Sequence, residues 1–153
     1  ALAGGCELAM VCDLIVAAET AKFGVPEVKR GLAAGAGGLL RFPRQLPYRV
    51  AMELALTGDF MDAARAKDLG FINQTVPEGE AFAAAQGLAV KIAGNGPLAV
   101  KLSKQVVRDS EDWSTGEMFG RQQDILQPVF TSEDAIEGAM AFAEKRAPNW
   151  KGR

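Results

Sequence analysis

The chain has 153 residues, of which 48% are apolar, and this is enough for about one domain with a hydrophobic core. Its formal net charge is −2 and its Lys and Arg residues are scattered, so the composition argues against a nucleic-acid partner. No apolar run approaches the roughly 18 residues that cross a bilayer. The opening Ala-Leu-Ala-Gly-Gly lacks the basic region of a signal peptide. We therefore expect a soluble, cytoplasmic protein with no membrane partner.

The chain contains no histidine, which removes Ser-His and Cys-His nucleophile pairs and most zinc chemistry. Acid–base catalysis would then depend on carboxylates, Lys, Tyr or backbone donors. Cys6 and Cys12 fit neither a zinc site nor a redox motif, and a pair of reduced thiols is the simpler interpretation. We expect no metal and no redox cofactor.

Short elements are predicted in the first part of the chain. In order, these are a helix at 4–12, a buried strand at 13–18, an extended stretch at 23–27 and a Gly-rich stretch at 31–40. Pro26 argues against a helix through Val25. The Gly-rich stretch matches neither a dinucleotide nor a P-loop fingerprint. It is either a loop that leads into a helix or a source of backbone donors, and both interpretations stay open.

Helices dominate the rest of the chain. They are predicted at 48–56, 62–70, 80–93, from 97, from 114 and at 132–145, with a short strand or extended link at 71–76. Thr57-Gly58 stops the helix at 48–56, Asp62 is a candidate N-cap and Pro97 fits a first helical turn. Ser114-Thr-Gly-Glu117 matches a capping box. The apolar stripes of these helices need a partner surface.

Two carboxylates are candidates for chemistry. Glu7 lies in the first turn of the predicted helix at 4–12, after Gly4 and Gly5, and Glu27 follows Pro26. Each also has a simpler explanation, because an acidic residue offsets a helix dipole and a Glu in a turn is commonly solvated. The two glycines either permit close packing or expose N–H groups to an enolate-like anion. Glu133, Asp134 and Glu137 are expected only to favour the start of the last helix.

Four stretches carry a resemblance to the enoyl-CoA hydratase (crotonase) family, and the resemblance covers essentially the whole chain. They are ALAGGCELAMVCDLIVAAETAKFGVPEVKRGL at 1–32, GAGGLLRFPR at 35–44, MELALTGDFMDAARAKDLGFIN at 52–73 and AFAEKRAPNWKG at 141–152. The resemblance implies an α/β fold, with the later β-β-α turns of a crotonase-like spiral at 1–60. A helical C-terminal trimerisation region at 61–153 would follow. The family's preceding β-β-α half is not in this sequence.

The resemblance also implies a catalytic site. Residues in the places of Glu7 and Glu27 are the family's two catalytic carboxylates, which flank the water that is added across the α,β double bond of an enoyl-CoA thioester. The backbone N–H at the place of Gly4 belongs to the oxyanion hole, and that at Gly35 helps to hold the water. The second oxyanion donor belongs to the half that this sequence lacks.

Near the C-terminus, Phe142 and Lys145 match positions that reach CoA in the family, often from a neighbouring subunit. The implied partners are an acyl-CoA substrate and further copies of the chain, as a homotrimer or hexamer. CoA is carried by the substrate, so no separate cofactor is implied. The sequence departs from the family at Ala3, where a third glycine is common, and at Ala34, where proline is common.

Both carboxylates together favour a hydratase or the reverse dehydratase. Two alternatives stay open. An enoyl-CoA isomerase of the same family could work with one carboxylate, and a truncated relative could be a non-catalytic assembly or binding module in which Glu7 and Glu27 are idle.

Overall fold

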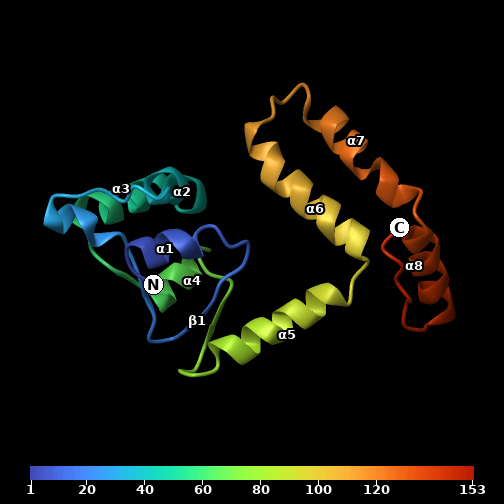
Figure 1. The fold of residues 1–153 in the computed structure, drawn as a ribbon, viewed down its shortest axis with the longest axis horizontal. Coiled ribbons are helices and arrows are strands. Elements are labelled where there is room, and N and C mark those ends of the chain that lie inside the picture. The colour runs from blue at the N-terminus through green and yellow to red at the C-terminus, as the bar shows by residue number, and fades with distance from the viewer. The chain divides into compact units, whose positions relative to one another are not determined.

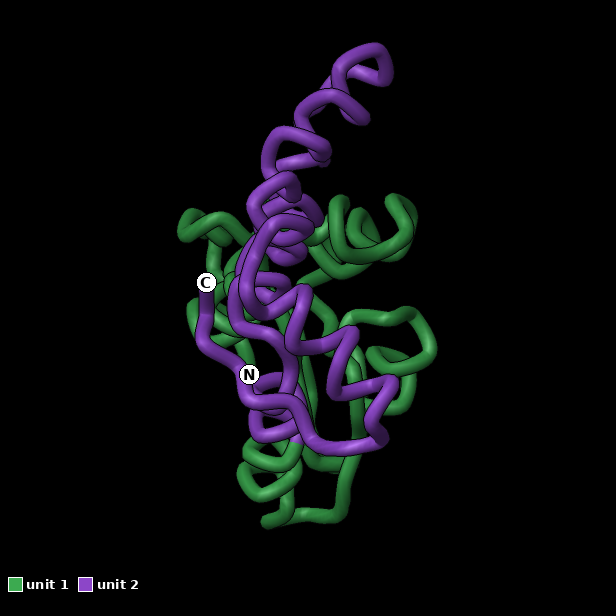
Figure 2. Tube along the Cα trace, turned by 90° about the vertical axis from the view of Figure 1, so that its right-hand side faces the viewer, with its two compact units in different colours: residues 1–87 green, residues 88–153 purple.

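The structure is a computed structural model that describes residues 1–153. It divides into two compact units, Ala1–Gly87 and Leu88–Arg153, which Figure 2 distinguishes by colour. The predicted division into 1–60 and 61–153 concerns the family's spiral core, and it stays a prediction. None of the helices combines the length and the apolar character that crossing a membrane requires.

The first unit contains short helices and short strands. Its elements are α1 (Gly4–Ala9), β1 (Val16–Ala18), β2 (Lys22–Phe23), the 3₁₀ helix η1 (Pro26–Arg30), α2 (Gly38–Gln45), α3 (Tyr48–Thr57), β3 (Met61–Asp62), α4 (Ala63–Asp68) and β4 (Gln74–Val76). Figure 1 labels α1 to α4 and β1 among them. β1 pairs in parallel with β4, and β2 pairs antiparallel with β3. The core of this unit includes Phe23, Phe42 and Phe71, and the Phe71 ring contacts each of the other two.

Several local signals act as the sequence predicts. The Asp62 side chain accepts the Arg65 N–H at 2.8 Å and so caps α4. Gly58 adopts a left-handed conformation, with φ of 65°, and ends α3. The Gly-rich stretch is a loop that leads into α2, as one of its two interpretations predicts.

Two predicted extended segments differ from the structure. Glu27 was expected in an extended stretch, but it lies in η1, which begins at Pro26. Proline restrains the residue before it, and Val25 is indeed non-helical, whereas proline itself fits the first turn of a helix. The strand expected at 13–18 is limited to Val16–Ala18, because only these residues pair with β4.

The second unit is helical. α5 (Ala81–Ala93) spans the boundary between the units, and α6 (Pro97–Asp109), the 3₁₀ helix η2 (Ser110–Asp112), α7 (Met118–Phe130) and α8 (Glu133–Glu144) follow. α6 and α7 lie side by side as a helical hairpin (Figure 1). The stripe of Leu98, Leu102 and Val106 on α6 is half-buried, whereas Ile136 and Met140 of α8 are exposed. A surface that covers them stays a prediction.

The predicted capping box at the start of α7 does not form. Glu117 is itself the N-cap residue, and its carboxylate accepts the Ser114 hydroxyl at 2.7 Å instead of capping the helix. Glu117 also lies 3.7 Å from Arg121, so its side chain is directed along the helix surface. A true side-chain cap occurs in α8, where the Ser132 hydroxyl accepts the Ala135 N–H at 3.0 Å.

Candidate active site

Glu7 is a buried carboxylate of α1 that lies against the start of α2. Cys6 and Met10 are four residues apart, so they lie on the same side of α1, and both are buried in the core. Glu7 follows Cys6 and is also buried, with 4% of its surface exposed. Glu7 Oε1 accepts the Gly38 N–H at 2.9 Å. Gly38 is the first residue of α2. The carboxylate therefore lies where unpaired N–H groups and the helix dipole favour negative charge.

Gly38 is a site residue that the sequence analysis did not identify. A Cβ on Gly38 would lie 3.0 Å from Glu7 Cγ and 3.1 Å from Glu7 Oε1. A side chain at this position would therefore displace the carboxylate. The available signal was the run of glycines before α2, but the sequence does not indicate which glycine approaches another residue.

Glu27 carries an unpaired oxygen. Its Oε2 is buried and has no hydrogen-bond partner in the chain. A buried polar atom without a partner is costly, and such atoms in folded proteins commonly bind water or a ligand. Glu27 Oε2 is therefore available to a small polar molecule.

The two carboxylates act on the same buried thiol. Burial is the main reason that the pKa of Cys6 is raised, and the negative charges of Glu27 and Glu7 raise it further. A backbone hydrogen bond with Gly24 acts in the opposite direction and lowers the pKa. Glu7 and Glu27, twenty positions apart in the sequence, thus both lie near enough to Cys6 for their charges to affect it.

The start of α1 is strained. Ala3, its N-cap residue, has φ of 52° and ψ of −129°, a region that suits glycine far better than alanine. The Ala3 carbonyl accepts the N–H groups of Cys6 and Glu7, and the Leu2 carbonyl accepts that of Gly5. Gly4 is exposed, and a Cβ there would meet nothing within 4 Å. A ligand can therefore approach the backbone at Gly4 closely.

The remaining predicted site residues lie in two places. Gly35 is exposed, in the turn just before α2. Phe142 and Lys145 belong to the second unit. Phe142, in the last turn of α8, is 88% exposed, and Lys145 is the C-cap residue with φ of 55°. The role predicted for each of these residues stays a prediction.

Comparison with known proteins gives consistent matches. The family model described as enoyl-CoA hydratase/isomerase matches residues 1–153. An enoyl-CoA hydratase of Mycobacterium tuberculosis is 45% identical over 153 residues, which are 100% of this chain and 58% of the relative. A carnitinyl-CoA dehydratase of Salmonella typhi is 40% identical over 157 residues, covering 100% of this chain and 60% of the relative. A crystal structure of an enoyl-CoA hydratase from Mycobacterium tuberculosis H37Rv has a TM-score of 0.98 at 58% identity, covering 100% of this chain and 61% of that one. The chain thus spans about 60% of the length of such relatives.

Proposed function

Because the chain belongs to the enoyl-CoA hydratase/isomerase family and has its crotonase-like α/β fold, we propose that the complete protein adds water across the α,β double bond of an enoyl-CoA thioester. The observation that carries the proposal is the pair of carboxylates. Glu7 is tied to the Gly38 N–H, and Glu27 has an unpaired buried oxygen. One carboxylate that is held in place and a second that has a free buried oxygen suit a water molecule bound between them.

In the proposed reaction, one carboxylate removes a proton from the water while the water oxygen forms a bond to Cβ of the substrate. The other side chain acts as a carboxylic acid, supplies the proton that bonds to Cα and becomes a carboxylate. The π electrons of the double bond form the new C–H bond by way of an enolate-like thioester. The two carboxylates then exchange protons with solvent, so that each regains its starting state. Positioned acid–base groups of this kind contribute on the order of 10²–10⁴ in rate.

The negative charge that grows on the thioester oxygen needs donors that are already in place. We assign one of them to the Gly4 N–H. The adjacent Gly5, Cys6 and Glu7 N–H groups already donate within the first turn, which supports Gly4 as the donor for an external acceptor. Gly35, before α2, is assigned to the water. Phe142 and Lys145 are assigned to CoA.

The names of the relatives support water chemistry in both directions, since one is an enoyl-CoA hydratase and another a carnitinyl-CoA dehydratase. Assembly of the complete protein as a trimer or hexamer is part of the proposal, because exposed apolar side chains on α8 need a covering surface. No cofactor is needed beyond the CoA that the substrate carries.

The test is single replacement of each carboxylate in the complete protein. Glu7→Gln and Glu27→Gln should each lower kcat for hydration of a short enoyl-CoA by about 10² or more. Hydration is followed by the loss of absorbance from the conjugated thioester. Glu19→Gln is the matched control, because Glu19 is exposed and lies outside the site. It should leave kcat unchanged.

The alternatives give different results. An isomerase that uses one carboxylate would tolerate one of the two replacements while moving the double bond of a β,γ-enoyl-CoA. A non-catalytic assembly or binding module would turn over neither substrate in its unaltered form. Either result would contradict the two-carboxylate hydratase.

A further inference from the structure

Lys145 adopts a left-handed backbone conformation, which is unfavourable for a residue that carries a side chain. It is one of two non-glycine residues in the chain with positive φ, at 55°, and the other is Ala3. Glycine and asparagine usually occupy such positions at the end of a helix. For lysine the left-handed conformation is a local cost, and such conformations persist only where surrounding contacts enforce them.

The residues that enforce it follow directly in the chain. Residues 146–153, here called the return segment, reverse direction after Lys145 and run back along α8. The Lys145 N–H donates to the Phe142 carbonyl at 3.3 Å, and the Arg146 N–H to the Ala141 carbonyl at 3.0 Å. A helical Lys145 would instead continue the direction of α8.

Glu137 and Arg146 make the strongest contact of the return segment. Arg146 Nη1 and Nη2 donate to the two oxygens of Glu137 at 2.6 and 2.9 Å, and Arg146 Nε donates to Glu144 at 2.5 Å. Glu137 also accepts the Asn149 N–H at 2.7 Å. A bidentate pair of this kind defines direction as well as distance. It therefore fixes where the chain goes immediately after Lys145.

The far end of the return segment is held independently. Asp134 is 6% exposed, and its two oxygens accept the N–H groups of Lys151 and Gly152 at 2.6 and 2.9 Å. Trp150 Nε1 donates to the Gly94 carbonyl at 2.8 Å. Asp134 and Glu137 are one helical turn apart, so they hold the segment from the same face of α8.

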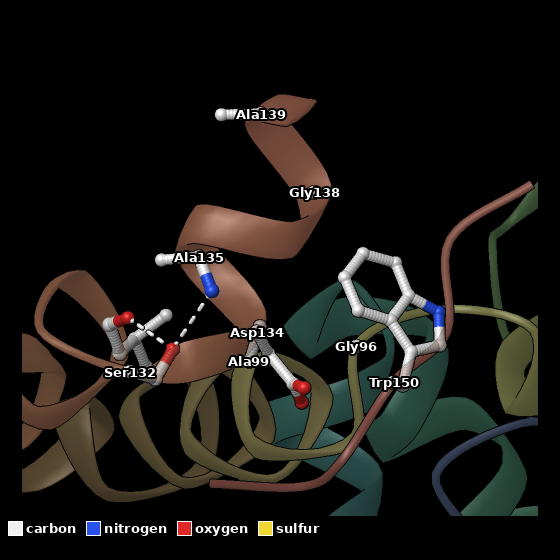
Figure 3. Close-up of a pocket in the computed structure, with 9 residues that line it drawn as sticks. Gly96, Ala99, Ser132, Asp134, Ala135, Gly138, Ala139 and Trp150 are labelled. Carbon is white, nitrogen blue, oxygen red and sulfur yellow. Dashed lines mark hydrogen bonds between the residues drawn. The ribbon is translucent and has the colours of Figure 1, made fainter. Parts of the chain in front are cut away.

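The Trp150 ring lies against a glycine. A Cβ on Gly138 would be only 3.2 Å from the ring. Figure 3 shows Trp150 next to Gly138, on one side of a half-open cavity of about 250 Å³ that Asp134 and Ala135 also line. The close packing of the Trp150 ring against Gly138 holds the middle of the return segment against α8.

We propose that the return segment holds Lys145 in its left-handed conformation for the contact with CoA, and that Glu137 and Arg146 are positioning residues for that contact. The inference rests on the assignment of Lys145 to CoA under the proposed function. CoA carries phosphates, and the exposed ammonium group of Lys145 is chemically suited to them. The apparent affinity of a protein for its ligand falls in proportion to the fraction of molecules whose conformation can bind that ligand.

The experiment uses the complete protein and measures both KM for a short enoyl-CoA and the rate of tryptic cleavage in residues 145–151. Glu137→Gln should speed cleavage and raise KM about fivefold with kcat unchanged. Loss of a negative charge near Lys145 would by itself lower KM, so the expected sign is the opposite of a simple charge effect. Glu133→Gln is the matched control, since Glu133 pairs with Arg153 at the far end of the segment, 3.2 Å away.

Gly138→Ala is the second variant, because it leaves every charge in place. Its methyl group should displace the Trp150 ring and so speed cleavage and raise KM in the same way. Gly120→Ala is its control, as a Cβ on Gly120 would meet nothing within 4 Å. If either variant loosens the segment while KM stays at the unaltered value, the segment serves stability alone and the inference is wrong. If neither variant speeds cleavage, the assigned contacts do not hold the segment.

Lys145→Ala separates this inference from the function on which it rests. If it raises KM and Glu137→Gln does not, the CoA contact stands and the positioning role fails. If Lys145→Ala leaves KM unchanged, the contact with CoA is wrong and the inference falls with it. Neither result bears on Glu7 and Glu27, whose replacement is judged by kcat.

Discussion

The Gly38 N–H donates to Glu7 Oε1 at 2.9 Å, and a methyl group on Gly38 would lie 3.0 Å from Glu7 Cγ. The first residue of α2 thus both holds the carboxylate and leaves the space that it occupies. Since Gly38 has no positive φ, its backbone does not require glycine. The requirement comes from Glu7.

Gly38→Ala should therefore impair activity more than stability. Alanine favours the helix, but its methyl group displaces Glu7, and a shift of about 1 Å in a catalytic group can cost on the order of 10² in rate. Steady-state hydration kinetics and thermal unfolding measure the two effects. Gly120→Ala makes the same change in an open position of α7 and should keep full activity. Equal activity in both variants would contradict the role of Gly38.

Ala3→Gly should stabilise the protein, although glycine usually weakens folded structure. The positive φ of Ala3 is strained for alanine and natural for glycine. After allowance for the greater freedom of glycine in the unfolded chain, we expect a gain of about 1 kcal/mol in the free energy of unfolding. Denaturant unfolding measures it. Ala83→Gly, at an exposed position in α5, should change stability by about the same amount in the opposite direction. A loss in both variants would show that Ala3 is unstrained.

Glu27→Gln should lower the pKa of Cys6. Burial is the larger cause of the raised value and remains, but the negative charge of Glu27 also raises the pKa and is removed. The pKa is followed by the ultraviolet absorbance of the thiolate in a Cys12→Ser background, where Cys6 is the one remaining cysteine of these 153 residues. Glu19→Gln serves again as the control. An unchanged Cys6 pKa would mean that Glu27 does not approach the thiol, independently of any assay of activity.

Glu137 should make the return segment sensitive to acid. Its hydrogen bonds with Arg146 and the Asn149 N–H lower its pKa from 4.5 to about 2. A lowered pKa in the folded state stabilises the protein above the unfolded value, and the contribution disappears as pH falls through the folded value. The difference in the free energy of unfolding between the unaltered protein and Glu137→Gln should thus have its full size above about pH 4.5 and should disappear as the pH falls toward 2.

Thermal unfolding of both proteins at several pH values measures that difference. Glu133→Gln provides the comparison, because Glu133 is an exposed acid on the same helix. If the difference in stability stays constant down to pH 2, the ionised carboxylate of Glu137 does not stabilise the folded protein.

The sequence by itself determined the local structure and the family. Asp62 caps α4, Pro97 begins α6 and Gly58 ends α3, because each of these signals acts within one turn of the chain. The four family-like stretches identified the family and the α/β fold, which the comparisons confirm. Local patterns failed where a competing contact was stronger, as at Glu117, whose carboxylate accepts the Ser114 hydroxyl.

Only the tertiary structure decided which distant groups meet. Glu7 and Gly38 are 31 positions apart, and no periodicity encodes that contact, since it depends on how α1 and α2 pack around the core. The same holds for Asp134 and Glu137. As sequence they favour the start of a helix, whereas the fold uses them to bind the return segment. Hydrogen-bond partners far along the chain are set by packing, and packing is a property of the whole fold.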